Sequence, residues 1–138
     1  TIRFGATVGT ERVAQIFYAR RSGRLDEIQM SYICGGQLFA ELHGVTTNAI
    51  ANDEPSDGIL GSLSQLGLTT EPSPRTMFAI DGGLPVKNGQ NLAIVFSTKN
   101  ACDVHISPES IVKLRREHES GTWTVDDSGS LALRILIH

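Results

Sequence analysis

The chain has 138 residues, of which 40% are hydrophobic and 20% charged, and its formal net charge is −3. These values exclude wholesale disorder and a sequence-independent nucleic-acid binder, which needs a basic face to neutralise phosphates. No apolar run is as long as the roughly 18–20 residues of a membrane helix, and the N-terminal segment lacks the apolar region of a signal peptide. We therefore expect a single domain over 1–138 that binds neither nucleic acid nor membrane.

Three runs in the first third of the chain predict β-strands. The first, 11–19, is rich in β-branched and aromatic residues. The second, 26–34, alternates apolar and polar residues, and the third, 37–45, does so again after a Gly-Gly break at 35–36. Two alternating runs joined by Gly-Gly predict a β-hairpin. The residues expected on the apolar faces are Ile28, Met30, Tyr32, Leu38, Ala40 and Leu42.

Three arginines, Arg20, Arg21 and Arg24, lie together in the polar segment between the first two runs. Such a segment is either a solvated hairpin tip or a basic contact for an acidic surface of a partner protein. Nucleic acid is disfavoured there, because Tyr18 is the only aromatic residue near the arginines. We therefore count the three arginines as candidates for a protein interface.

The segment 46–75 departs from the strand pattern, because it has no aromatic residue and is rich in turn-forming residues. An excursion of this length with little regular structure is typical of a functional or partner-bound segment. Apolar residues from 59 to 66 recur at helical spacing, and Ser56 could cap the start of a short helix. We expect an arm that folds back onto the sandwich or, as we favour, packs on a neighbouring subunit. The interface candidates in the arm are Ile59, Leu60, Leu63, Leu66 and Leu68.

The rest of the chain again predicts short strands separated by turns. The stretch 75–98 contains two apolar runs, broken by glycines and a proline and joined by an Asn-Gly turn at 88–89. These glycines do not form a phosphate-binding loop, because a strand-like run rather than a helix follows them. The run 130–138 alternates, whereas 107–119 fits either a helix or a short strand. The whole pattern predicts an all-β, antiparallel sandwich, jelly-roll-like, with 46–75 as a loop or short-helix insertion.

The two cysteines, Cys34 and Cys102, lie in or beside apolar runs. Buried free thiols are the default expectation, because cysteine packs as a small hydrophobic residue. A disulfide is the alternative, and it cannot be read from the sequence. Two cysteines without an export signal indicate synthesis in a reducing cytosol.

Motifs for catalysis and for cofactor binding are missing from the sequence. The acidic cluster at 53–57 departs from the EF-hand pattern and predicts a solvated loop or a contact for arginines of a partner. No serine-nucleophile motif is present. We therefore expect no enzyme, no metal, no cofactor and no small-molecule substrate. The histidines, none of which is paired at metal-binding spacing, are His43, His105, His118 and His138.

The order of these features resembles that of small β-sandwich or jelly-roll structural proteins of viruses, and it is most similar to the decoration (cement) proteins of tailed phages. The resemblance is carried by the alternating runs around the Gly-Gly break, the long insertion, and the Gly-Leu-Pro-Val corner with its Asn-Gly turn in 81–98. It implies a virion protein on the capsid exterior, synthesised in the host cytoplasm. It further implies a homotrimer that binds the major capsid protein and stabilises the shell, without catalytic residues.

Other classes of protein remain as alternatives. A carbohydrate- or receptor-binding β-sandwich would contact its ligand through Trp123, Tyr18, Tyr32 or the acidic loop, although aromatic residues make up only 6% of the chain. A penton or minor capsid protein is a close variant of the decoration protein. A small enzyme on a β-scaffold is disfavoured by the missing nucleophile and metal motifs.

Overall fold

A computed structural model describes residues 2–5, 12–47, 53–65, 73–79, 83–107, 115–117, 122–126 and 128–138. Within these ranges every regular element is a β-strand, every strand pairing is antiparallel, and no helix is long and apolar enough to cross a membrane. The strands are β1 (Ile2–Phe4), β2 (Val13–Tyr18), β3 (Gly23–Cys34), β4 (Leu38–Thr47), β5 (Asp53–Gln65), β6 (Ser73–Ala79), β7 (Leu84–Val86), β8 (Asn91–Thr98), β9 (Cys102–Val104), β10 (Ile106–Ser107), β11 (Arg115–Glu117), β12 (Trp123–Val125), β13 (Ser130–Leu131) and β14 (Arg134–Ile137).

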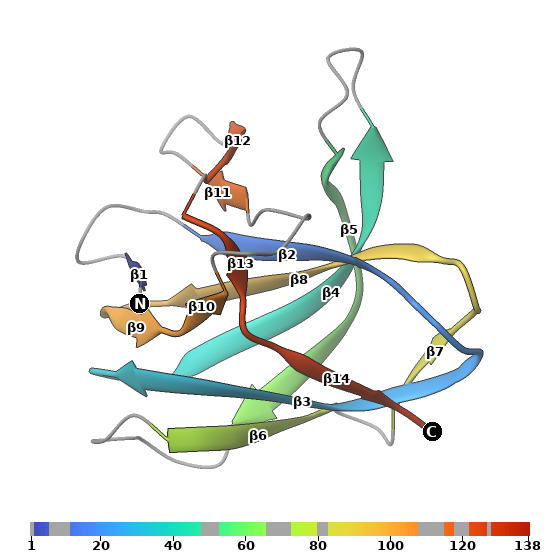
Figure 1. The fold of residues 1–138 in the computed structure, drawn as a ribbon, viewed down its shortest axis with the longest axis horizontal. Helices are drawn as coiled ribbons and strands as arrows, with labels where there is room; N and C mark the ends of the chain where they lie inside the picture. The colour runs from blue at the N-terminus through green and yellow to red at the C-terminus, as the bar shows by residue number, and fades with distance from the viewer. Residues whose placement is uncertain are drawn as a thin grey trace.

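The strands form one long sheet that folds over itself, together with a small second sheet. The order in the long sheet is β1-β9-β3-β6-β5-β4-β8-β2-β11-β12, and β7 and β14 pair with β3 beside that path. The second sheet is β10-β13. In Figure 1, β3, β6 and β14 run across one side of the molecule, and β4, β8 and β2 run behind and above them. The predicted all-β antiparallel sandwich is confirmed, whereas the jelly-roll order stays a prediction.

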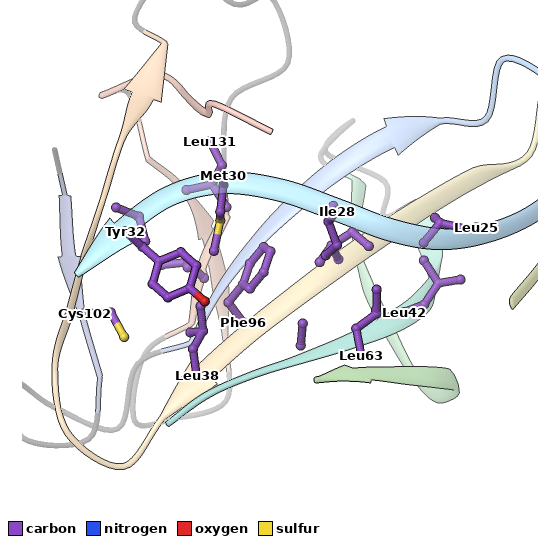
Figure 2. Packing of buried hydrophobic residues seen from close by; sticks show 14 of the residues in the cluster. Leu25, Ile28, Met30, Tyr32, Leu38, Leu42, Leu63, Phe96, Cys102 and Leu131 are labelled. Carbon is purple, nitrogen blue, oxygen red and sulfur yellow. The ribbon is translucent and has the colours of Figure 1, made fainter. Parts of the chain in front are cut away.

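The core lies between these two layers and follows the alternation read from the sequence. Ile28, Met30 and Tyr32 of β3 are 1%, 5% and 1% exposed. Figure 2 shows them pointing from β3 toward β4 and β8, where Leu38 and Phe96 meet them. Burial of apolar surface at about 25 cal/mol per Å² is the main force that holds the layers together.

The predicted hairpin around Gly35 and Gly36 is wrong. β3 lies between β9 and β6, and β4 lies between β5 and β8, so the Gly-Gly break carries the chain from one layer to the other. The arginine-rich turn of 20–24 is likewise no hairpin tip, because β2 pairs with β8 and β11 rather than with β3. Glycine and polar residues indicate where the chain turns, but they do not determine with which strands the segments before and after the turn pair.

The short helix expected within 46–75 is also wrong over the described residues, since Asp53–Gln65 is strand β5. β5 pairs with β4 along most of its length and with β6 through residues 63–65, so it joins the two layers. Gly58 and Gly61 lower helix propensity, and irregularities in the ladder break the two-residue period. The apparent helical spacing arises because the extra residue Leu60 falls between two regularly paired parts of the strand.

Cys34 and Cys102 form a disulfide, so the default expectation of free thiols is wrong. The two residues are direct partners in the β3-β9 ladder, with their Cα atoms 4.1 Å apart. The side chains are buried, at 6% and 1% exposure. The bond joins positions 68 residues apart in the chain and fastens β9 to β3.

The C-terminal half contains the predicted Asn-Gly turn at 88–89 and the segment 107–119, for which the sequence left helix and strand open. At the Asn-Gly turn Gly89 has a φ of 84°, and the amide of Gln90 donates to the carbonyl of Lys87 at 3.0 Å, so the predicted positive-φ turn is confirmed. Within 107–119, residues 115–117 form strand β11, and 108–114 and 118–119 lie outside the described residues.

Candidate functional site

The ladder between β4 and β5 contains two irregularities that build a polar pocket. His43 pairs with Ile59, but Val45 pairs with Pro55, so residues 56–58 bulge out opposite Gly44. A Cβ atom at Gly44 would lie 3.0 Å from Oγ of Ser56, tighter than most such contacts. The bulge and the absence of a side chain at Gly44 together bring Ser56 over β4, and bulges of this kind re-aim side chains beside functional sites.

His43 lies under this bulge and is 4% exposed. Its Nδ1 is 2.7 Å from the carbonyl oxygen of Ser56, and its Nε2 is 3.4 Å from Oε1 of Glu41. Because a carbonyl oxygen only accepts hydrogen bonds, Nδ1 carries a proton and donates a hydrogen bond to the carbonyl oxygen of Ser56. In the neutral ring, Nε2 is then an unprotonated nitrogen facing the carboxylate, and only an imidazolium would donate to both partners.

Arg12 joins this pocket to β11 and β12. Its Nε and Nη2 donate to the two carboxylate oxygens of Glu117 at 2.8 and 2.6 Å, a bidentate pair. Nη1 lies 4.0 Å from Glu41, and the guanidinium carbon is 5.4 Å from the ring centre of Trp123. The hydrogen bonds with Glu117 raise the pKa of Arg12 above its ordinary value, so the guanidinium is a fixed positive charge.

These residues enclose a cavity of about 210 Å³, which we call the His43 pocket. It contains one arginine and four carboxylates, and it therefore favours ligands that donate hydrogen bonds or carry positive charge. Among the residues that the structure describes, no three His, Cys, Asp or Glu side chains are arranged so that they could hold a metal ion. The pocket is lined by Arg12, Glu41, His43, Glu54, Pro55, Ser56, Asp57, Ile59, Glu117 and Trp123.

A second, larger hollow of about 450 Å³ lies between the end of β2 and strand β14. Its floor is apolar and its rim is basic, so its chemistry is opposite to that of the His43 pocket. Tyr18 at its edge is 56% exposed. We call it the Arg20 groove; it is lined by Phe17, Tyr18, Arg20, Arg21, Leu133, Ile135, Leu136, Ile137 and His138.

The structure separates the basic residues that the sequence grouped together. Arg20 and Arg21 are exposed and lie at the rim of the Arg20 groove. The side chain of Arg24 instead packs over Gly83 and donates to its carbonyl oxygen at 3.3 Å. Arg24 therefore braces Gly83 and β7 against β3 although it is itself exposed, whereas Arg20 and Arg21 make no such contact among the described residues.

The apolar candidates of the segment 46–75 divide in the same way. Ile59 and Leu60 are 56% and 53% exposed, which leaves both available to a partner. Leu63 is 3% exposed and belongs to the chain's own core, so in the single chain it presents no surface to a partner. Leu66 and Leu68 lie outside the described residues.

Sequence reasoning missed the His43 pocket, although part of its signal was present. The acidic cluster at 53–57 is visible in the sequence, and Glu54 and Asp57 of that cluster line the pocket. Glu41 and His43 stand on the polar side of β4, two residues apart, which places both on one face. Arg12 and Glu117 are 105 positions apart, and nothing in the linear sequence pairs them.

Comparison with known proteins gives no relative for this arrangement. No family model matches the chain, and no curated protein or solved structure matches it.

Proposed function

We propose that this chain is a structural protein of a bacteriophage virion, a capsid decoration protein that oligomerises and stabilises the shell by binding the major capsid protein. The observation that carries the proposal is the exposed apolar pair Ile59 and Leu60 at 56% and 53% exposure. Large apolar side chains grouped on a protruding element mark protein contacts, because their exposure to water is unfavourable.

Support also comes from the element that presents this pair. We define the β4-β5 ribbon as residues 44–47 and 53–60, and Figure 1 shows the end of β4 and the start of β5 rising above the rest of the sheet. Nε of Arg115 donates to the carbonyl oxygen of Asp53 at 2.8 Å, and Nδ2 of Asn91 donates to its carboxylate at 3.2 Å. A braced ribbon loses less conformational freedom on binding than a free loop would, which favours affinity.

The test is binding to shells assembled from the major capsid protein of the same virus. We expect the wild-type chain to sediment with the shells at a fixed, saturable ratio and to raise their melting temperature. The double variant Ile59→Ser/Leu60→Ser should lose most of this binding while it keeps its fold. Failure of the wild-type chain to sediment with the shells at any concentration would contradict the proposal.

A second candidate function is carbohydrate or receptor binding, and the His43 pocket favours it. Trp123 lies in that pocket beside carboxylates, which accept hydrogen bonds from sugar hydroxyls. The pocket is also a hollow, as small-ligand sites are, and the exposed side chain of Ile59 forms part of its wall. A glycan array decides between them: a strong signal that Trp123→Ala abolishes and Tyr18→Ala leaves unchanged would establish the second function.

A further inference from the structure

Two surfaces of this chain have opposite chemistry. The Arg20 groove has an apolar floor and a basic rim, and the β4-β5 ribbon carries acidic residues followed by exposed apolar ones. The groove lies between β2 and β14, and the ribbon rises from β4 and β5 at another part of the molecule (Figure 1). The groove and the ribbon therefore carry opposite charges, and both also expose apolar surface.

The two arginines at the rim of the groove have no partner among the described residues. Arg20 and Arg21 are exposed, and neither takes part in an ion pair or hydrogen bond in the part of the chain that is described. His138, at the far end of the groove, differs because its Nδ1 is 2.8 Å from the carboxylate of Asp26. The two guanidinium groups can thus meet carboxylates of another molecule without breaking an existing contact.

The floor of the groove offers apolar surface and a strand edge. Ile135 and Ile137 of β14 lie there with Phe17 of β2, and all three are partly buried against the core. β14 pairs with β3 on one side, and its other edge has no ladder partner among the described strands. An extended segment laid in the groove could bury its apolar side chains and also pair with this edge.

The β4-β5 ribbon carries matching groups in a short span. Glu54 and Asp57 precede Ile59 and Leu60 in the chain. Asp57, Ile59 and Leu60 are exposed, and Glu54 is half-buried. An ion pair with the arginines and burial of the two apolar side chains can therefore occur together. The match between a basic apolar groove and an acidic apolar ribbon identifies a second copy of this chain as the occupant.

We propose that the β4-β5 ribbon of one copy docks in the Arg20 groove of the next copy. The proposal rests on the self-association contained in the proposed function. It assigns the Ile59-Leu60 pair to the contact between copies, so that the pair supports shell binding through the assembled oligomer. Because ribbon and groove are different surfaces, the contact is head-to-tail, and it closes into a ring, such as a trimer, when the rotation between copies returns to the first.

Charge reversal tests the contact directly. Arg20→Glu/Arg21→Glu gives the chain an acidic groove, and Glu54→Lys/Asp57→Lys gives it a basic ribbon. Each double variant should associate at least about tenfold more weakly than wild type in light scattering at low salt, because like charges then face each other. The quadruple variant, which combines both reversals, should associate again, since its own groove and ribbon are complementary.

Mixing adds a second measurement from the same proteins. An equimolar mixture of the two double variants should form mixed complexes that neither variant forms alone, because each unlike contact is favourable and each like contact is not. Lys99→Glu, an exposed change at another site, should leave association unchanged. Circular dichroism and urea unfolding of each variant confirm that it is folded before it is compared.

Three outcomes would overturn this docking mode. The first is wild-type self-association that neither double variant weakens, the second is a quadruple variant that does not recover, and the third is a wild-type chain that stays monomeric at every concentration. None of these results decides whether the chain binds capsid shells, which the sedimentation experiment measures separately. Failure of the docking mode with shell binding retained is therefore distinguishable from failure of shell binding itself.

Discussion

Nδ1 of His43 lies 2.7 Å from the carbonyl oxygen of Ser56, and this contact ties strand β4 to the bulge in β5. The bulge takes residues 56–58 out of the ladder, so the backbone carbonyl of Ser56 needs another donor. A histidine buried to 4% exposure provides it. The same contact positions Ser56 and Asp57 at the wall of the His43 pocket.

Replacing His43 should therefore loosen the bulge. In His43→Leu the Ser56 carbonyl loses its donor, and we expect the free energy of unfolding to fall by about 1–3 kcal/mol. His43→Asn is the matched control, because an amide nitrogen can take the place of Nδ1, and its loss should be smaller. Urea denaturation measures both, and equal losses would show that the hydrogen bond does not hold the bulge.

The bidentate pair of Arg12 and Glu117 should be energetically coupled. A double-mutant cycle with alanine at both positions should give a coupling of about 1 kcal/mol or more, because the bonds are charge-assisted and partly shielded from water. The bidentate pair Arg3–Asp103 has similar geometry but a more exposed arginine, at 62% against 35%, and should couple less. A larger coupling at the exposed pair would contradict this ranking.

The single tryptophan reports on the same contact. Arg12 covers Trp123, so Arg12→Ala should expose the indole to water and move its fluorescence emission to longer wavelength. Arg3→Ala, which breaks the exposed pair, is the control and should leave the emission spectrum unchanged.

The disulfide should contribute strongly to stability. Cys34→Ala/Cys102→Ala frees a loop of 68 residues in the unfolded chain, and the loop-entropy relation gives a loss of about 4 kcal/mol. Thermal unfolding of the oxidised chain, the reduced chain and the double variant measures it. Because both cysteines are buried, thiol reductants should reduce the disulfide of the native protein slowly. The rate of reduction should follow the rate at which the protein unfolds locally around the bond. Rapid reduction of the fully folded protein would contradict this.

Leu63 and Leu60 should respond differently to substitution, although they lie three residues apart. Leu63→Ala removes a core side chain and should cost about 2–5 kcal/mol of unfolding free energy. Leu60→Ser changes a side chain that is 53% exposed, so it should alter the stability of the monomer by no more than about 0.5 kcal/mol. If the β4-β5 ribbon docks as proposed, Leu60→Ser should weaken self-association. Denaturation and light scattering on the two variants separate the roles.

Acid should remove the stability contributed by Asp103 and Asp126. Hydrogen bonding to Arg3 lowers the pKa of Asp103 below its ordinary 3.8. Burial alone would raise the pKa of Asp126, but hydrogen bonds from Ser128 and Arg116 lower it overall. A depressed native pKa means that each carboxylate stabilises the fold above pH 3.8 and loses this effect as the pH falls through the native value.

Substitution at one of these carboxylates shows the effect. Asp126→Asn should be less stable than wild type at neutral pH, and the difference should shrink as the pH falls below the ordinary carboxyl value. Chemical denaturation across the acid range measures this difference. A gap between the two proteins that stays constant down to the lowest pH would show that the charge of Asp126 is not responsible.

Much of the local structure could be predicted from the sequence. The alternation of Ile28, Met30 and Tyr32 marked the buried face of β3, because a two-residue period can bury one face only as a strand. The turn at Gly89 followed from the ease with which glycine adopts a positive φ. The candidate site was predictable only in part, because the sequence shows the acidic cluster but does not show that Glu54 and Asp57 lie in a pocket with Arg12 and Glu117.

Pairing and burial were decided by the tertiary structure. The Gly-Gly break at 35–36 permits a hairpin or a crossing between layers, and only the packing of β4 beside β5 and β8 selects the crossing. The bond between Cys34 and Cys102 and the pair of Arg12 and Glu117 likewise join residues far apart in the chain. The alternating runs of β3 and β4 could be recognised as strands with one apolar face from the sequence, since this depends on neighbouring residues, whereas the strand β5 could not. Which strands meet, and so where the His43 pocket and the Arg20 groove form, depends on the burial of all those faces at once.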